Sequence, residues 1–252
     1  MAEATLDPRQ ISETVNRLRL RVQARFPSSG LGAVATQLTD VAARASATAE
    51  WIARPITPLR ILVFALIGLI AVGLGLTLLA LPWPQGRLQL AEFIQVLESG
   101  INDVVLIVAA VFFLASLETR VKRNRALRSI HELRAIAHVI DMHQLTKDPE
   151  WILDRGKETG ILPSRSMTPF ELSRYLDYCS EMLSITGKIA ALYIQKFDDG
   201  VALQAVNEVE NVTTALSGKI WQKLMILYAL HGLDQNQAPR DPKSPAEVPD
   251  PV

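Results

Sequence analysis

The sequence predicts an all-α membrane protein, in which a two-span transmembrane helical hairpin joins N-terminal amphipathic helices to a cytoplasmic antiparallel helical bundle. The first observation is a pair of long apolar runs, residues 61–81 and 104–117, since a helix needs roughly 20 apolar residues to cross the bilayer core. The second is that apolar residues on both sides of these runs recur at helical spacing. The third is that the alternating pattern of a β-strand does not occur in the sequence.

The composition restricts the class of protein. Among 252 residues, 26 Lys and Arg balance 26 Asp and Glu, so no net charge attracts nucleic acid. The single cysteine, Cys179, cannot form an internal disulfide, and we expect it to pack as a small hydrophobic side chain. The sequence has neither a glycine-rich phosphate loop nor a recognisable nucleophile–base arrangement. We therefore expect no enzyme activity, no catalytic residues and no cofactor.

Residues 1–57 are predicted to form cytoplasmic amphipathic helices. The first has an apolar stripe that begins at Ile11, and residues 27–30 (Pro-Ser-Ser-Gly) end it. The second repeats apolar residues at three-to-four spacing from Leu31 to Ile52, just before the membrane. This helix could pack on the C-terminal domain, pair with a second copy, or lie on the inner leaflet. Its polar face has few Lys or Arg residues, which disfavours the third alternative.

Residues 58–118 are predicted to be the transmembrane hairpin, with spans at about 61–81 and 99–118. The first span carries small residues that allow helices to approach closely in lipid, either within the hairpin or between subunits. These residues are Gly68, Ala71 and Gly75.

The second apolar run, residues 104–117, would reach only about 21 Å as a helix. The second span must therefore include upstream residues, which brings Glu98 and Asp103 to the outer membrane boundary. Asp103 either faces water at the level of the headgroups, or faces a partner helix or an aqueous path.

Basic residues predict the orientation. Arg54 and Arg60 precede the first span, five Lys and Arg residues follow the second, and the loop between them holds Arg87 alone. The positive-inside rule places both termini in the cytoplasm, in a multi-pass protein of the bacterial inner membrane. Trp83 fits an interfacial anchor at the outer end of the first span. The residues predicted to contact lipid headgroups are Arg120, Lys122, Arg123 and Arg125.

Residues 119–232 are predicted to form the cytoplasmic bundle. The helix of the second span continues into it as far as the Thr146–Pro149 stop, and a short helix follows at about 150–158. Thr168, Pro169 and Glu171 have the spacing of a capping box with a first-turn proline.

The capping box opens a helix that is expected to run to Phe197. After a turn, a last helix is expected over about 201–230, and Gly232 is expected to end it. The proline-rich residues 233–252 are expected to be a disordered tail.

One polar stripe in the predicted bundle contains His131, Arg134, His138 and Asp141, which fall within about 80° on a helix. His131 and His138 are two turns apart, about 10 Å, so one metal ion cannot bind both. A metal site would use His138 and Asp141 with ligands from another helix. The alternative is a polar bundle face or a subunit contact.

The layout predicts a membrane-anchored, self-associating scaffold or regulatory protein. Its partners would be the lipid bilayer, further copies of the chain and a cytoplasmic protein. The alternative is an oligomeric pore with an acidic outer mouth at Glu98 and Asp103, and a metal-dependent enzyme is the third hypothesis. In topology alone, the layout resembles two-span membrane effectors of bacterial defence systems and small membrane scaffolds.

Overall fold

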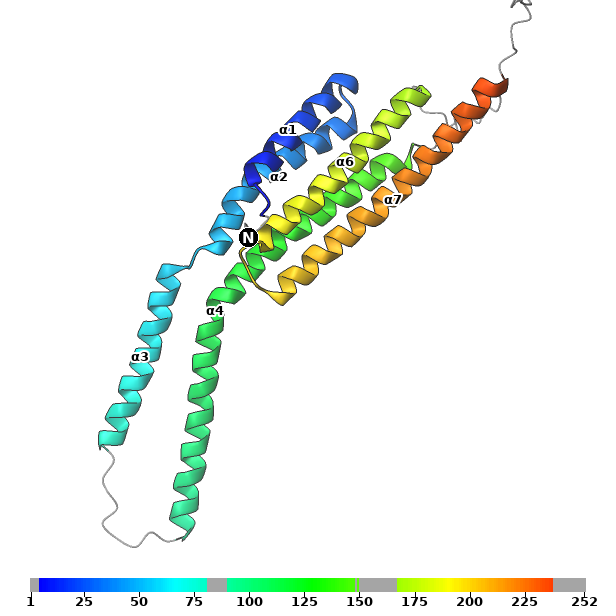
Figure 1. Cartoon of the computed structure of the whole chain (residues 1–252). Coiled ribbons are helices and arrows are strands. Elements are labelled where there is room, and N and C mark those ends of the chain that lie inside the picture. The colour runs from blue at the N-terminus through cyan, green and yellow to red at the C-terminus, as the bar shows by residue number, and fades with distance from the viewer. Residues whose placement is uncertain (1–4, 81–89, 148, 150–166, 238–252) are drawn as a thin grey trace, which may run out of the picture.

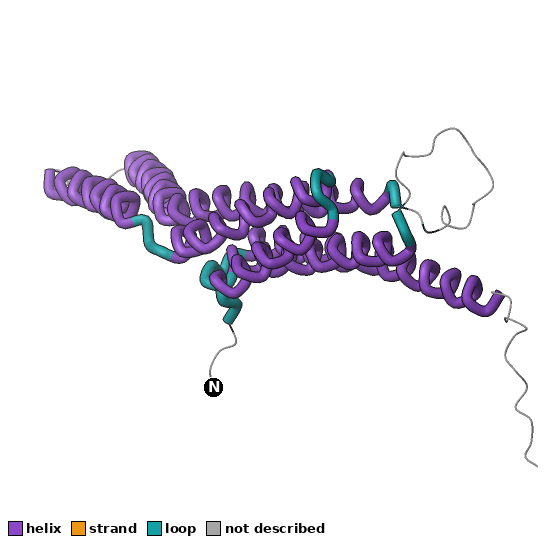
Figure 2. The backbone as a smooth tube through the Cα atoms, turned by 90° about the horizontal axis from the view of Figure 1, so that it is seen from above, coloured by secondary structure: helices purple, strands orange, loops and turns teal. Residues whose placement is uncertain are grey.

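The computed structural model describes residues 5–80, 90–147, 149 and 167–237. These residues form helices and loops, without a strand among them (Figures 1 and 2). The all-α prediction is therefore confirmed. The helices are α1 (Pro8–Arg25), α2 (Gly30–Ala53), α3 (Thr57–Ala80), α4 (Leu90–Leu145), α6 (Pro169–Ile194) and α7 (Gly200–Gln237).

The two N-terminal helices begin at capped residues. The Asp7 carboxylate accepts a hydrogen bond from the Arg9 amide, and the Ser29 hydroxyl accepts one from the Gly32 amide. Each such bond satisfies a backbone N–H that has no partner within its own helix. Ser28 lies in the turn between them with a φ of 62°, a left-handed conformation that breaks the helix. The buried residues of α1 are the predicted stripe, Ile11, Val15, Leu18 and Val22.

Helix α6 lies at the centre of the bundle and contacts α1, α2, α4 and α7. Fifteen of its 26 residues are buried, as expected for a helix covered on most of its circumference. Thr168 and Glu171 form the predicted capping box, in which the Thr168 hydroxyl accepts from the Glu171 amide and the Glu171 carboxylate accepts from the Thr168 amide.

The α1–α2 pair packs on this central helix, which settles where the second amphipathic helix lies within one chain. Phe26 meets the ring of Tyr175 edge-to-face, with 5.3 Å between centroids. Arg21 forms two hydrogen bonds with Glu181, at 2.9 and 3.0 Å. Within the chain, residues 5–53 therefore share one hydrophobic core with α4, α6 and α7.

Two predicted helix ends are wrong. Helix α6 stops at Ile194 instead of Phe197, and α7 continues through Gly232 to Gln237. Glycine permits a helix to end but does not force it to, and no proline follows within the next turn. Three predicted features lie outside the described residues: the short helix at 150–158, Trp83, and residues 238–252 of the tail.

Candidate functional site

Helix α3 and the first part of α4 project together from one end of the bundle (Figure 1). Both helices are long and apolar enough to cross a membrane, and their most apolar windows are unburied in the chain. Large side chains such as Phe64 (70% exposed), Leu79 (85%) and Phe112 (71%) point outward. A core helix of a soluble protein would bury such residues, so we call these two segments the apolar arms.

The two arms face each other along one seam. The half-buried residues of α3 include Leu59, Val63, Ile67 and Ile70, and those of α4 include Ile107, Val111, Leu114 and Glu118. Both sets follow three-to-four spacing, which is the pattern of two helices that pack nearly parallel or antiparallel.

The small residues of α3 lie on a different face. At about 100° per residue, Gly68, Ala71 and Gly75 point about 120° away from the seam. Gly68 and Ala71 are exposed and Gly75 is half-buried, and a Cβ atom added at Gly68 or Gly75 would have no described atom within 4 Å. Contact between these residues and a second copy stays a prediction.

The acidic candidates Glu98 and Asp103 are both exposed within α4. Asp103 lies on the same helix face as Ile107, Val111 and Leu114, because steps of three and four residues separate them. It is therefore directed toward the α3 side of the arm. Glu98 lies more than one turn further from the bundle.

At the base of the arms, Glu118 holds three groups together. Its carboxylate accepts hydrogen bonds from the Arg60 guanidinium of α3 and from the Ile56 amide of the α2–α3 linker, the latter at 3.2 Å. The Lys122 ammonium lies 2.8 Å from the same carboxylate. This junction fixes the first turn of α3 to the middle of α4.

The next basic residue of α4 is bound to the turn between α6 and α7. Arg123 donates to both oxygens of Asp199 at 2.7–3.0 Å, and Asp199 also accepts from the Ala202 amide at 2.9 Å. The carboxylate thus caps α7 and binds α4 at once. Burial would raise the pKa of Asp199, but the hydrogen bonds from Arg123 and Ala202 outweigh it, so the pKa is lower than usual.

The four predicted headgroup ligands therefore divide into two pairs. Lys122 and Arg123 are engaged by carboxylates within the chain. Arg120 and Arg125 are exposed and lie over the rings of Phe113 and Trp51, at 5.2 and 4.5 Å. Sequence reasoning missed the Arg123–Asp199 pair because 76 positions separate its members. The aspartate in a turn before a helix was the only local signal.

The metal candidates are not brought together with further ligands among the described residues, where no group of three potential ligands lies close. His131 and His138 are exposed. Arg134 pairs with Glu208 on α7 at 3.0 Å, and the Asp141 carboxylate accepts from the Gln144 amide at 2.6 Å. This stripe is thus partly occupied by contacts within the chain.

Two side chains of the bundle with titratable groups, Lys223 and Cys179, have structural roles. The Lys223 ammonium donates to the backbone carbonyls of Gln144 and Lys147 at 2.8 and 3.1 Å, where it caps the C-terminus of α4. Cys179 is fully buried, and this burial raises the pKa of its thiol to about 12. The thiol is therefore neutral at physiological pH, as a core residue and not a nucleophile.

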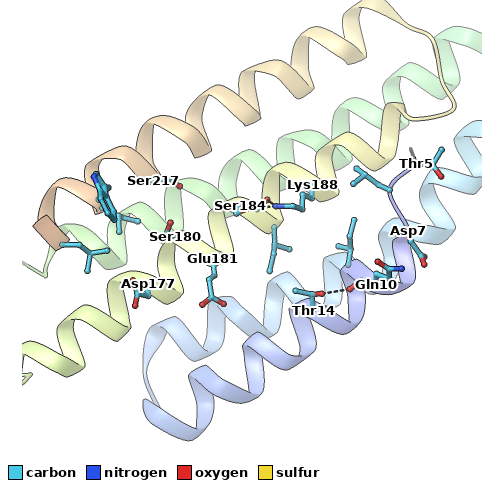
Figure 3. Close-up of a pocket in the computed structure, with 16 residues that line it drawn as sticks. Thr5, Asp7, Gln10, Thr14, Asp177, Ser180, Glu181, Ser184, Lys188 and Ser217 are labelled. Atoms are coloured by element: carbon cyan, nitrogen blue, oxygen red, sulfur yellow. Dashed lines mark hydrogen bonds between the residues drawn. The ribbon is translucent and has the colours of Figure 1, made fainter. Parts of the chain in front are cut away.

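A groove of about 820 Å³ runs along the bundle between α1, α6 and α7 (Figure 3). Its apolar lining includes Ile11, Ile220 and Leu224, and Trp221 lies at its α7 wall. Hydroxyl groups of Ser180 and Ser184 on α6 face it from the central helix. The sequence did not predict this groove, because it depends on how far apart two helices lie on a third.

Comparison of the chain with protein-family models, with curated proteins and with solved structures finds no match.

Proposed function

We propose that this protein is a membrane-anchored, self-associating helical scaffold or regulatory protein. In this proposal the two apolar arms are a transmembrane hairpin in the bacterial inner membrane, and the bundle and both termini lie in the cytoplasm. The observation that carries it is α4, a single 56-residue helix that belongs both to an apolar arm and to the bundle. A continuous helix transmits displacement or rotation along its axis.

The junction at Glu118 supports this role, because it fastens α3 to α4 where the arms meet the bundle. The Arg123–Asp199 pair fastens α4 to α6 and α7 one turn further on. Movement between the arms would therefore reach the α6–α7 turn through these charged contacts as well as through the apolar packing of α4 on α6 and α7. An anchor alone would need only one span and no such connection.

The outward stripe of Gly68, Ala71 and Gly75 supports self-association. Small residues allow close packing of helix backbones in lipid, and a Cβ atom added at Gly68 or Gly75 would meet no described atom within 4 Å. Gly75→Leu is expected to reduce the mass of the detergent-solubilised complex, measured by light scattering on size exclusion. Leu76→Phe adds bulk to another exposed face of α3 and is the control. A strictly monomeric wild-type protein, or an unchanged mass for Gly75→Leu, would contradict self-association through this stripe.

The proposed orientation predicts that single cysteines introduced at exposed positions of the bundle react with a membrane-impermeant maleimide only after the inner membrane is opened. Lys219 on α7 is such a position. Labelling of Lys219→Cys from the periplasmic side of intact spheroplasts would contradict the proposed orientation. The buried Cys179 supplies no background signal in the folded protein.

An oligomeric pore is the second candidate function, and Asp103 favours it. With the inner membrane boundary at Glu118, the helix rise of 1.5 Å places Glu98 about 30 Å away, at the outer boundary. Asp103 is then about 22 Å away and within the bilayer core, where ionisable groups are rare and functional. Cation flux in liposomes that Asp103→Asn reduces would support the pore. The absence of flux, or flux unchanged by Asp103→Asn, would contradict the pore and leave the scaffold as the proposed function.

A further inference from the structure

Helix α7 presents three large side chains to solvent along one stripe. Trp221 is 61% exposed, Met225 50% and Tyr228 56%. Positions separated by four and three residues share one face of a helix. Exposed aromatic residues gathered in this way mark a binding surface, since isolated apolar residues are the ordinary case on a protein. We call these three residues the α7 stripe.

The α7 stripe borders the groove between α1, α6 and α7. Trp221 belongs to the groove wall, and the Tyr228 hydroxyl lies 3.3 Å from the Ser173 hydroxyl of α6. Ser180 on α6 and Ser217 on α7 line the same groove (Figure 3). Aromatic faces beside hydrogen-bond donors suit a polyproline II segment, whose prolines pack on rings and whose free carbonyls accept hydrogen bonds.

A segment with this chemistry follows α7 in the chain. Helix α7 ends at Gln237, and the sequence continues with prolines at positions 239, 242 and 245. A polyproline II helix has three residues per turn, so this spacing would place all three prolines on one face. Three prolines spaced three residues apart occur only within residues 238–252 of the sequence.

The reach of this segment matches the α7 stripe. At about 3.1 Å per residue from Gln237, a chain that folds back brings Pro242 about 16 Å and Pro245 about 25 Å along α7. The helix rise of 1.5 Å places Tyr228 about 14 Å and Trp221 about 24 Å back from the same residue. Two prolines and two aromatic rings therefore coincide in order and in spacing.

We propose that residues 238–252 bind back onto the bundle of their own chain, with Pro242 on Tyr228, Pro245 on Trp221, and the following residues in the groove. This contact would cover the α7 stripe and close the open side of α6. It is independent of the function proposed above, since it needs neither self-association nor conduction. A binding partner of the bundle would have to displace this segment to reach the groove.

Disulfide trapping in the full-length protein in detergent tests the contact. Ser217→Cys combined with Ala246→Cys is expected to form an intrachain disulfide under mild oxidation, independently of protein concentration. Lys219→Cys with Ala246→Cys is the matched control, because position 219 lies on the opposite side of α7 from position 217. Equal trapping by both pairs, or none by either, would overturn the proposal. Trapping only as covalent dimers would assign the groove to the tail of another copy and would also overturn it.

Limited trypsin digestion supplies a second measurement, at the bond after Lys243. Substitution of Trp221→Ala together with Tyr228→Ala is expected to speed this cleavage by about tenfold. The loss of a modest aromatic contact weakens binding of the segment by about this factor. Ile226→Ala removes an exposed side chain from another face of α7 and is the control. These positions are exposed, so folding is retained, which circular dichroism checks. Equal cleavage rates in both variants and the wild type would contradict the contact.

Discussion

Asp199 shows how one residue can serve two helices. Its side chain is 3% exposed, caps α7 through the Ala202 amide and holds Arg123 of α4. Arg123 is 36% exposed, so solvent screens part of this interaction. The carboxylate is nonetheless oriented by four hydrogen bonds from two directions. One charged side chain thus joins the α6–α7 turn to α4, in addition to the apolar packing of α4 on α6 and α7.

Asp199→Asn is expected to lower the free energy of unfolding by roughly 1–2 kcal/mol, because it removes the charge-assisted part of this pair. Chemical unfolding of the full-length protein in detergent, followed by circular dichroism, measures the change. Asp198→Asn alters the neighbouring exposed carboxylate and is expected to have almost no effect. Equal losses in the two variants would show that the pair contributes nothing.

The contribution of Asp199 should also depend on pH. Because its pKa is lower in the folded state than usual, the stabilisation is complete above the unfolded pKa, near pH 4. This stabilisation is lost as the pH falls through the pKa that Asp199 has in the folded state. The stability difference between wild type and Asp199→Asn should therefore be constant near neutrality and shrink in acid. A difference that grows as the pH falls would contradict the sign of this shift.

Cys179 is expected to resist thiol reagents until the bundle unfolds, since it is fully buried and its pKa is raised to about 12. Its labelling rate with iodoacetamide should rise together with the loss of helical signal in denaturant. Rapid labelling of the native protein at pH 8 would contradict the buried position. An introduced, exposed Lys219→Cys provides the reference rate.

At the scale of elements, local sequence determined most of the helices. The capping box at Thr168 and the stripe from Ile11 to Val22 depend on contacts three or four residues apart, and both are confirmed. The continuation of α4 from its apolar part to Leu145 is also confirmed. Helix α7 was predicted too short, because the frayed end of an exposed helix is governed by weak propensities.

Glu118→Ala is expected to loosen α3 from α4, because it removes the acceptor shared by Arg60, Lys122 and the Ile56 amide. Spin labels at exposed Leu69 and Val108 should then show a broader distance distribution in pulsed electron resonance. Glu132→Ala breaks the Arg44 pair within the bundle and serves as the control. A distribution unchanged by Glu118→Ala would mean that the seam alone holds the arms.

At the scale of the whole molecule, the N-terminal helices belong to the same core as the C-terminal ones. Leu18 of α1 is 2% exposed, and Leu216 of α7 is 6% exposed, within one cluster of buried residues. Domains that share a core unfold together. The sequence offered three positions for the second amphipathic helix, and within one chain this helix packs on α4 and α6. Pairing with a second copy stays a prediction.

Leu18→Ala and Leu216→Ala are therefore expected to destabilise the same cooperative unfolding transition. Each should lower the free energy of unfolding by about 2–4 kcal/mol, because each leaves a cavity in a packed core. Differential scanning calorimetry of the detergent-solubilised protein would resolve one bundle transition in both variants. Leu20→Ala, at a position 51% exposed on α1, should leave it nearly unchanged. Two separate transitions, with Leu18→Ala affecting one alone, would show independent folding of residues 5–53.

The sequence by itself determined the helices, the apolar stripe of α1 and the two apolar arms, because these follow from neighbours within a few turns. Only the tertiary structure decided which charges pair, that Gly68, Ala71 and Gly75 lie away from the α3–α4 seam, and that α1 and α7 leave a groove over α6. These features join positions far apart in the chain, such as Arg123 and Asp199, and periodicity has no information about them. They depend on how the helices rotate as they pack into one core.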